Sequence, residues 1–238
     1  MKLDILAFGA HPDDVELGCG GTLAKEIALG KKVGIVDLTR GELGTRGTAE
    51  IRDIEAQKAA AVLGVAVREN LQLADGFFSN DKESQLAVIK MIRKYQPDVV
   101  LCNAVNDRHI DHGKGSKLVS DACFLSGLIK ITTNLEGHSQ QAWRPKQVYH
   151  YIQWLPIVPD FVVDISGYME QKTAAIMAYD SQFYKPETNE PITPIATQNF
   201  LESIKYRAQD LGRLIGTDFA EGFTTERCLA VSSLDDLI

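Results

Sequence analysis

One stretch near the start of the chain decides the fold, the apolar run Leu3-Asp4-Ile5-Leu6-Ala7-Phe8-Gly9-Ala10. Such a short run of apolar residues is typical of a buried strand. A helical pattern follows over residues 16–29, Gly30 stands where that helix ends, and a second β-rich run covers residues 33–38. A strand, a helix and a strand in this order predict a βαβ unit, and hence a parallel sheet with a right-handed crossover.

The same alternation continues along the chain. Further strands are expected at residues 67–73 and 99–102, and further helices at residues 49–63, after the capping residue Thr48, at 83–95 and at 113–129. Beyond residue 130 we expect strands at 148–153, 161–165 and 228–231, helices at 168–179 and 200–214, and a loop marked by Pro186, Pro191 and Pro194. The pattern predicts an α/β fold in one domain, residues 1–238. Residues 1–130 would form a mostly parallel sheet flanked by helices, and residues 131–238 a C-terminal α/β extension packed on it.

Composition narrows the class of protein. The chain has 238 residues, of which 32 are acidic and 25 basic, so its net charge is −7. This balance argues against a nucleic-acid binder or a basic membrane-surface protein, because both gather lysine and arginine against phosphates. There is no run of ~18 apolar residues to span a membrane, and the first apolar run is too short and polar for an export signal. Four widely spaced cysteines fit a reducing compartment, so we expect a cytoplasmic protein.

Two clusters of titratable residues follow predicted strands. They are Ala10-His11-Pro12-Asp13-Asp14-Val15-Glu16, directly after the first strand, and Asn106-Asp107-Arg108-His109-Ile110-Asp111-His112, after the strand at 99–102. Open α/β sheets bind their ligands at the carboxyl ends of the strands. Both clusters are therefore expected at one binding crevice.

The clusters contain residue types that suit a catalytic metal site. A catalytic zinc commonly has three protein ligands of the His₂-carboxylate kind and keeps a fourth position for water, whose pKa it lowers to roughly 7. His11, Asp14 and His112 could supply that set. Iron(II) fits the same ligands, so an oxidoreductase with a facial triad is an alternative of another class.

Neighbouring residues could handle protons. Asp13 would stay free beside the water as a general base. A protonated His109 could act from the opposite side, on an oxyanion or a leaving amine, and either Asp111 or Asp107 could orient its ring.

Simpler interpretations exist for the same residues. Asp13 or Asp14 could only cap the helix that follows, and His109 and His112 could be solvated loop residues. A non-catalytic sugar-binding or metal-storage domain is therefore a further alternative. The stretch Gly18-Cys19-Gly20-Gly21-Thr22 lacks the third small residue and the lysine of phosphate loops, so it predicts close packing of the first helix on the sheet.

Arginines gather near the expected mouth of the crevice. Arg40 and Arg46 lie in a glycine-containing loop after the second strand, and Arg52 lies in the helix that follows. Their guanidinium groups could bind a carboxylate or a hydroxyl-rich ligand. Arg108, in the second cluster, is a further candidate for substrate binding.

The two clusters resemble the motifs of a known enzyme family. Ala10-His11-Pro12-Asp13-Asp14 with Asp107-Arg108-His109-Ile110-Asp111-His112 is similar to the LmbE-like, PIG-L type N-acetylglucosamine deacetylases, over nearly the whole chain. The resemblance implies a Rossmann-like fold and zinc-dependent hydrolysis of the acetamide of an N-acetylglucosaminyl substrate. It implies the following roles: His11, Asp14 and His112 as zinc ligands, Asp13 as general base, His109 facing the oxyanion or leaving amine with Asp111 oriented towards it, and Arg52 as a substrate contact.

Other stretches are similar to the bacillithiol-pathway branch of this family, namely residues 38–47, Ser181-Gln182-Phe183, Arg213-Leu214-Ile215-Gly216 and Glu221-Gly222-Phe223. Members of that branch deacetylate N-acetylglucosaminyl malate, and related enzymes form hexamers. The resemblance thus implies a small-molecule substrate and a homo-oligomer, with a hexamer as one form. The two carboxylates of malate would give the arginines a role. Another N-acetylglucosamine conjugate or a chitooligosaccharide is the alternative substrate.

Two positions depart from the family pattern. Ile110 replaces the usual proline of the second motif, which changes loop stiffness more than ligand chemistry. Phe200 falls where some relatives carry a tyrosine that helps to hold the oxyanion. Either His109 and the metal carry more of that stabilisation, or Tyr184 substitutes.

Overall fold

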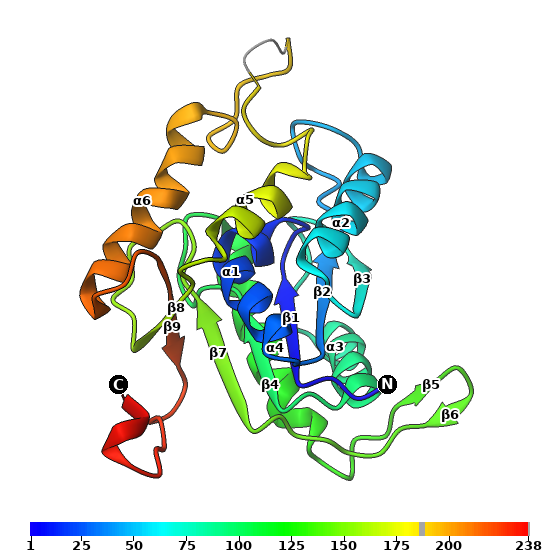
Figure 1. Ribbon diagram of the computed structural model, residues 1–238. Coiled ribbons are helices and arrows are strands. Elements are labelled where there is room, and N and C mark those ends of the chain that lie inside the picture. Colours follow the sequence, from blue (N-terminus) through cyan, green and yellow to red (C-terminus); the bar gives the residue numbers. More distant parts are fainter. Residues whose placement is uncertain (186–188, 238) are drawn as a thin grey trace.

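A seven-stranded, mostly parallel sheet forms the centre of the computed structural model, which describes residues 1–185 and 189–237 (Figure 1). The strands stand in the order β3-β2-β1-β4-β7-β9-β8. They are β1 (Ile5–Gly9), β2 (Val33–Thr39), β3 (Val67–Leu73), β4 (Val99–Cys102), β7 (Gln147–Tyr151), β8 (Phe161–Asp164) and β9 (Ala220–Thr225). All neighbours from β3 to β7 pair in parallel, whereas β9 runs antiparallel to both β7 and β8. The predicted α/β fold with a C-terminal extension is confirmed.

Helices cover both faces of this sheet. The helices of the described residues are α1 (Asp14–Ala28), α2 (Ala49–Leu63), α3 (Lys82–Tyr95), α4 (Ile110–Ser126), α5 (Met169–Met177), α6 (Gln198–Ile215) and, near the C-terminus, the 3-10 helix η1 (Leu234–Leu237). In Figure 1, α1, α2 and α5 lie in front of the sheet, and α3 and α4 lie behind it. Within the described ranges, no helix is long and apolar enough to cross a membrane.

The first strand shows why the sheet is covered on both sides. Its side chains alternate between the two faces. Leu6 and Phe8 join the core formed with α3 and α4, while Ile5 and Ala7 join the core formed with α1 and α5. An uninterrupted apolar run is what a strand buried on both faces requires.

Local signals fix the ends of the best-predicted helix. Thr48 caps α2, because its hydroxyl accepts a hydrogen bond from the Ile51 N–H (3.3 Å). Gly64 ends α2 in the left-handed region, at φ 81°, where a β-carbon would be strained. Both bounds of α2 agree with the sequence prediction.

Other boundaries differ from the prediction. Residues 228–231 form no strand, and the last strand of the described residues is β9. The sequence pattern missed β9 because it contains polar residues such as Glu221, which is buried in an ion pair with Lys172 (2.5 Å). Helix α4 begins at Ile110, earlier than predicted, because the ring of His109 caps it. The short pair β5 (Asn134–Leu135) and β6 (His138–Ser139) gave no pattern in the sequence. Pro186 of the predicted loop lies outside the described residues.

Close packing explains the glycines of α1, as predicted. A β-carbon on Gly18 would lie 2.1 Å from Cδ2 of Tyr151, and one on Gly21 would lie 2.7 Å from Cδ1 of Ile165. Larger side chains would therefore push α1 away from the sheet. This keeps the start of α1, and the residues just before it, against the strand ends.

The strand order reverses between β1 and β4. From β1 the chain first adds β2 and β3 on one side, and then crosses to β4 on the other. Such a switch point leaves a crevice outside the carboxyl ends of the two strands. The first titratable cluster follows β1 and the second follows β4, so the topology brings both to this crevice.

Candidate metal centre and catalytic pocket

A cavity of about 400 Å³ opens at this crevice. Residues from both titratable clusters line it, which confirms that the fold brings the clusters together. They are His11, Asp13, Asp14, Asp107, Arg108, His109, Ile110 and His112.

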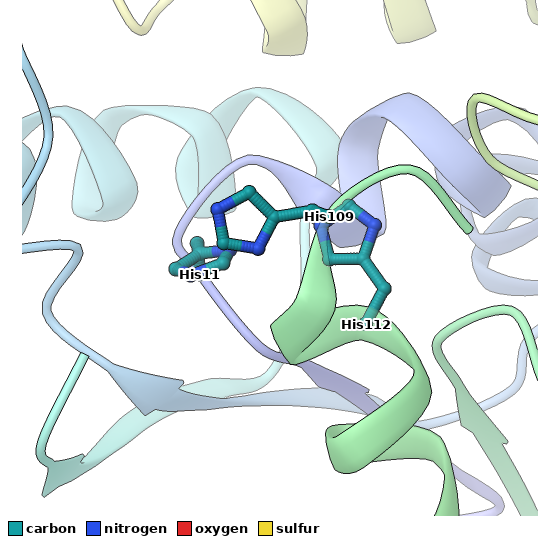
Figure 2. Close-up of side chains that lie close together, drawn as sticks. All are labelled: His11, His109 and His112. Atoms are coloured by element: carbon teal, nitrogen blue, oxygen red, sulfur yellow. The ribbon is translucent and has the colours of Figure 1, made fainter. Parts of the chain in front are cut away.

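Three histidine rings gather at the cavity (Figure 2). The ring centroids of His11 and His109 are 4.6 Å apart, those of His109 and His112 are 5.1 Å apart, and those of His11 and His112 are 5.7 Å apart. One nitrogen of each ring lies within 4.8 Å of the others, and so do ligand atoms of His11, Asp75 and Asp111. These distances make the cluster a candidate His and Asp metal site.

The carboxylate of Asp14 lies between two of these rings. Its Oδ1 is 3.1 Å from Nε2 of His112, and its Oδ2 is 3.5 Å from Nδ1 of His11. The other nitrogen of each ring contacts a different carboxylate: Nδ1 of His112 is 2.5 Å from Asp107, and Nε2 of His11 is 3.0 Å from Asp75. Carboxylates that hold the outer nitrogen of a metal-binding histidine fix the ring in this way.

The Asp14 carboxylate is ionised and attracts positive charge. Burial alone would raise the pKa of Asp14, but the His112 and His11 rings hold it well below its usual range. Burial alone would lower the pKa of His112, but Asp14 and Asp107 raise it to about 9. Once the His112 ring gives up its proton to an incoming metal, two imidazoles and an ionised carboxylate converge here, and this donor set fits a divalent ion such as zinc.

Asp13 occupies a strained and buried position. It precedes α1 with φ 112°, a region that favours glycine, and its carboxylate makes no capping bond to the helix. Its Oδ2 instead pairs with Nη2 of Arg52 at 3.2 Å. Burial raises the pKa of Asp13 to about 7, against the opposing charge of Arg52. The capping interpretation of Asp13 is therefore wrong, and the carboxylate is held for another purpose.

Arg52 holds Asp13 from a buried position. Its guanidinium also donates to the carbonyl oxygen of Pro12 and to Oε1 of Gln182 (3.2 Å). The Gln182 amide in turn donates to the carbonyl oxygen of Arg46 (2.8 Å). The loop after β2 and the segment after α5 are thus tied together beside Asp13.

His109 stands at the start of α4 and faces the cavity. Its Nδ1 accepts a hydrogen bond from the Asp111 N–H (3.3 Å), so a neutral ring carries its proton on Nε2. Burial, together with the charges of His11 and His112, lowers the pKa of His109. This favours a neutral hydrogen-bond donor over the protonated ring expected from the sequence.

Neither aspartate orients His109 as the sequence analysis expects. The Asp111 carboxylate accepts from the Gly76 N–H (2.7 Å) and from Lys114 (3.1 Å), and it lies 3.4 Å from Nε2 of His11. The reason is that α4 already begins at Ile110, so Asp111 contacts His109 only through its backbone N–H. Asp111 and Asp75 together hold His11, while Asp107 holds His112.

The sequence analysis missed three polar residues, Asp75, Asn103 and Gln153. Asn103 Nδ2 donates to Oδ2 of Asp14 (3.0 Å), and Gln153 Nε2 donates to its Oδ1 (2.9 Å). The two amides also contact each other, Asn103 Nδ2 to Gln153 Oε1 at 3.0 Å. All three follow the carboxyl end of a strand of the sheet, and this was the available signal.

We expect Gln153→Leu to weaken metal binding by roughly 10–100-fold, the range typical of groups that orient a ligand. The leucine has a similar volume but cannot donate to Asp14, so the carboxylate loses one of its two amide donors. Competition with a chelator of known affinity measures the change. Gln171→Leu is the matched control, because Gln171 donates to the carbonyl oxygen of Val62 and neither residue lines the cavity. Unchanged affinity in Gln153→Leu would remove this role from the amide.

Two of the predicted substrate-binding arginines do not line the cavity. Arg40 pairs with Asp53 (2.6 Å) and Glu50 (3.2 Å), the acids of the first turns of α2. Arg46 is buried and donates to the carbonyl oxygen of Phe183. Neither lines the cavity as the sequence analysis expects, because Arg40 is held by acids of α2 and Arg46 is turned towards the segment after α5. Arg52 and Arg108 do line the cavity.

Aromatic residues form another part of the lining. Phe200 lies there, as expected, and stacks on Trp154 with ring centroids 5.4 Å apart. Among the described residues that line the cavity, Tyr184 is absent, so no tyrosine replaces the missing hydroxyl there.

Comparison with known proteins identifies the family. A family model described as GlcNAc-PI de-N-acetylase, PIG-L, matches residues 6–123. The diacetylchitobiose deacetylase of Thermococcus kodakarensis is 30% identical over 194 residues, which are 75% of this chain and 70% of that protein. The chain belongs to the PIG-L family of de-N-acetylases.

Two solved structures share the whole fold. The conserved protein TT1542 of Thermus thermophilus is 38% identical, with a TM-score of 0.84 over 97% of this chain and 98% of that one. The N,N'-diacetylchitobiose deacetylase of Pyrococcus horikoshii, solved with its inhibitor MPG, is 26% identical, with a TM-score of 0.78 over 98% of this chain and 88% of that one. The chain is therefore an N-deacetylase, a hydrolase of carbon–nitrogen bonds. This conclusion sets aside the oxidoreductase and the non-catalytic binding domain.

Proposed function

We propose that this metal-dependent N-deacetylase of N-acetylglucosamine-containing substrates acts on N-acetylglucosaminyl malate, and releases acetate and the free amine. The observation that carries the reaction is the position of Asp13, which is buried and whose carboxylate makes no capping bond to α1, beside a His and Asp cluster that lines the cavity. The malate is supported by the four stretches similar to the bacillithiol branch. In the fold, Arg46 and Gln182 of these stretches hydrogen-bond beside Arg52.

The metal ligands in this proposal are His11 through Nδ1, Asp14, and His112 through Nε2. The supporting geometry is that each ring turns this nitrogen to Asp14 and its other nitrogen to an outer carboxylate. A zinc ion held there would polarise the acetamide carbonyl and acidify a water molecule, and iron(II) fits the same ligands.

Asp13 is the proposed general base. Its carboxylate accepts a proton from the attacking water, and Arg52 keeps it in place through the 3.2 Å ion pair. His109 is proposed to donate its Nε2 proton in a hydrogen bond to the carbonyl oxygen as negative charge develops there. The amine then leaves with the proton that Asp13 took from the water, because a neutral His109 has no acidic proton to give. Arg108 and Arg52 are proposed substrate contacts, while the homo-oligomer and the cytoplasmic location stay predictions of the sequence.

An acetate-release assay tests the proposal. The metal-loaded chain is compared on N-acetylglucosaminyl malate, free N-acetylglucosamine and diacetylchitobiose. We expect kcat/KM to be at least about tenfold higher for the malate compound, because one hydrogen bond to a charged group contributes ~1.5 kcal/mol or more. Equal values on all three substrates would contradict the malate assignment, and no acetate from any of them would contradict the whole proposal.

A further inference from the structure

The cations of the cavity differ in whether a carboxylate neutralises them. Arg52 is paired with Asp13, and Lys172 is paired with Glu221 at 2.5 Å. Arg108 and Arg207 also line the cavity, and no carboxylate of the described residues lies within 4.0 Å of either guanidinium. The positive charge available to a ligand is therefore concentrated at these two residues.

Arg108 and Arg207 come from different elements and meet at Trp154. Arg108 precedes α4, and its guanidinium carbon lies 4.6 Å from the centroid of the Trp154 ring. Arg207 lies on α6, and its Nη2 donates to the carbonyl oxygen of Trp154 (3.0 Å). One nitrogen of the Arg207 fork is thus used for anchoring, and the rest of the fork is left for a ligand.

Burial removes part of the water around the charged Arg207 guanidinium, and a bound anion would replace that solvation. The residue is half-buried, and burial lowers the pKa of its guanidinium, although Asp107 opposes this. Asp107 is itself engaged by His112 Nδ1 (2.5 Å) and the Leu155 N–H (2.7 Å). A partly desolvated guanidinium whose nearby acid is occupied favours an incoming carboxylate.

We propose that Arg207 and Arg108, on either side of the loop that carries Trp154, form a subsite for a carboxylate on the aglycone of the substrate. This inference rests on the proposed function, since it concerns the same cavity. It moves the recognition of the anion away from Arg40 and Arg46, which face acids and carbonyls of their own surroundings. Asp107 links the two functions of the cavity, because it holds His112 and belongs to the same loop as Arg108.

The test compares N-acetylglucosaminyl malate with its dimethyl ester, in which two methyl groups replace the negative charges. In Arg207→Gln and Arg108→Gln, we expect KM for the acid to rise by roughly 10–100-fold, the loss expected for a hydrogen bond to a charged group. For Arg207→Gln, kcat for the acid and kcat/KM for the ester should change little. Arg207→Lys keeps the charge and should recover part of the affinity.

Arg213→Gln is the matched control, because Arg213 lies on the same helix, exposed and paired with Asp210 at 2.8 Å. An equal loss on acid and ester would indicate a structural role for Arg207 and overturn the subsite. No loss on either would overturn it as well. Calorimetric binding of the product, glucosaminyl malate, gives a second readout. If the wild-type chain released no acetate at all, the proposed function would fail, while this binding comparison would still decide the subsite.

Discussion

Asp13→Asn should leave metal binding intact and lower kcat for acetate release by about 10²–10⁴-fold, the usual contribution of a general base. Asparagine has nearly the same shape, and it can still accept a hydrogen bond from Arg52 at the position of Oδ2. It cannot take a proton from the attacking water. Metal content, measured on the same sample as acetate release, separates this effect from the loss of the metal.

The control for this substitution is Asp53→Asn, which removes an acid of α2 whose partner, Arg40, lies outside the cavity. It should keep both metal and turnover. Wild-type turnover in Asp13→Asn with a full complement of metal would refute the assignment of the base.

The fold could be predicted largely from the sequence because β1 and β4, at the centre of the sheet, are continuous apolar runs. The segments Val67–Leu73 and Val99–Cys102 are strands with the predicted bounds, and α2 lies between the cap and the glycine that predict its ends. Strand β9 could not be found in this way. Its buried Glu221 owes its place to Lys172 and to the Gly21 and Thr22 N–H groups, partners far away in the sequence.

The site was predictable where chemistry and strand ends coincide. His11, Asp13 and Asp14 directly follow β1, so the sheet rule and the residue types point to the same place. Asp75, Asn103 and Gln153 follow strand ends too, but a single acid or amide in a loop does not stand out. For Arg46 and Arg207, the sequence carries no signal of which way the side chain points. Only the packing of the loops decides that the first points to Phe183 and the second to the cavity.

His112→Ala should lose the metal and, with it, acetate release. Its Nε2 contacts Asp14 at 3.1 Å while Asp107 fixes the other side of the ring, so the substitution removes a proposed ligand and leaves its outer partner in place. The loss in metal affinity should exceed the roughly 100-fold upper limit typical of outer partners such as Gln153. His138→Ala, at an exposed histidine of β6, is the control and should bind metal like the wild type.

The most direct test is to remove the metal with a chelator and to titrate zinc back while acetate release is measured. We predict that the metal-free wild-type chain is inactive, that activity rises in proportion to bound zinc until each chain holds one ion, and that His112→Ala gains no activity over the same range. If the metal-free chain released acetate at the rate of the zinc-loaded chain, the reaction would not depend on a metal ion bound by His11, Asp14 and His112, and the central claim would be contradicted.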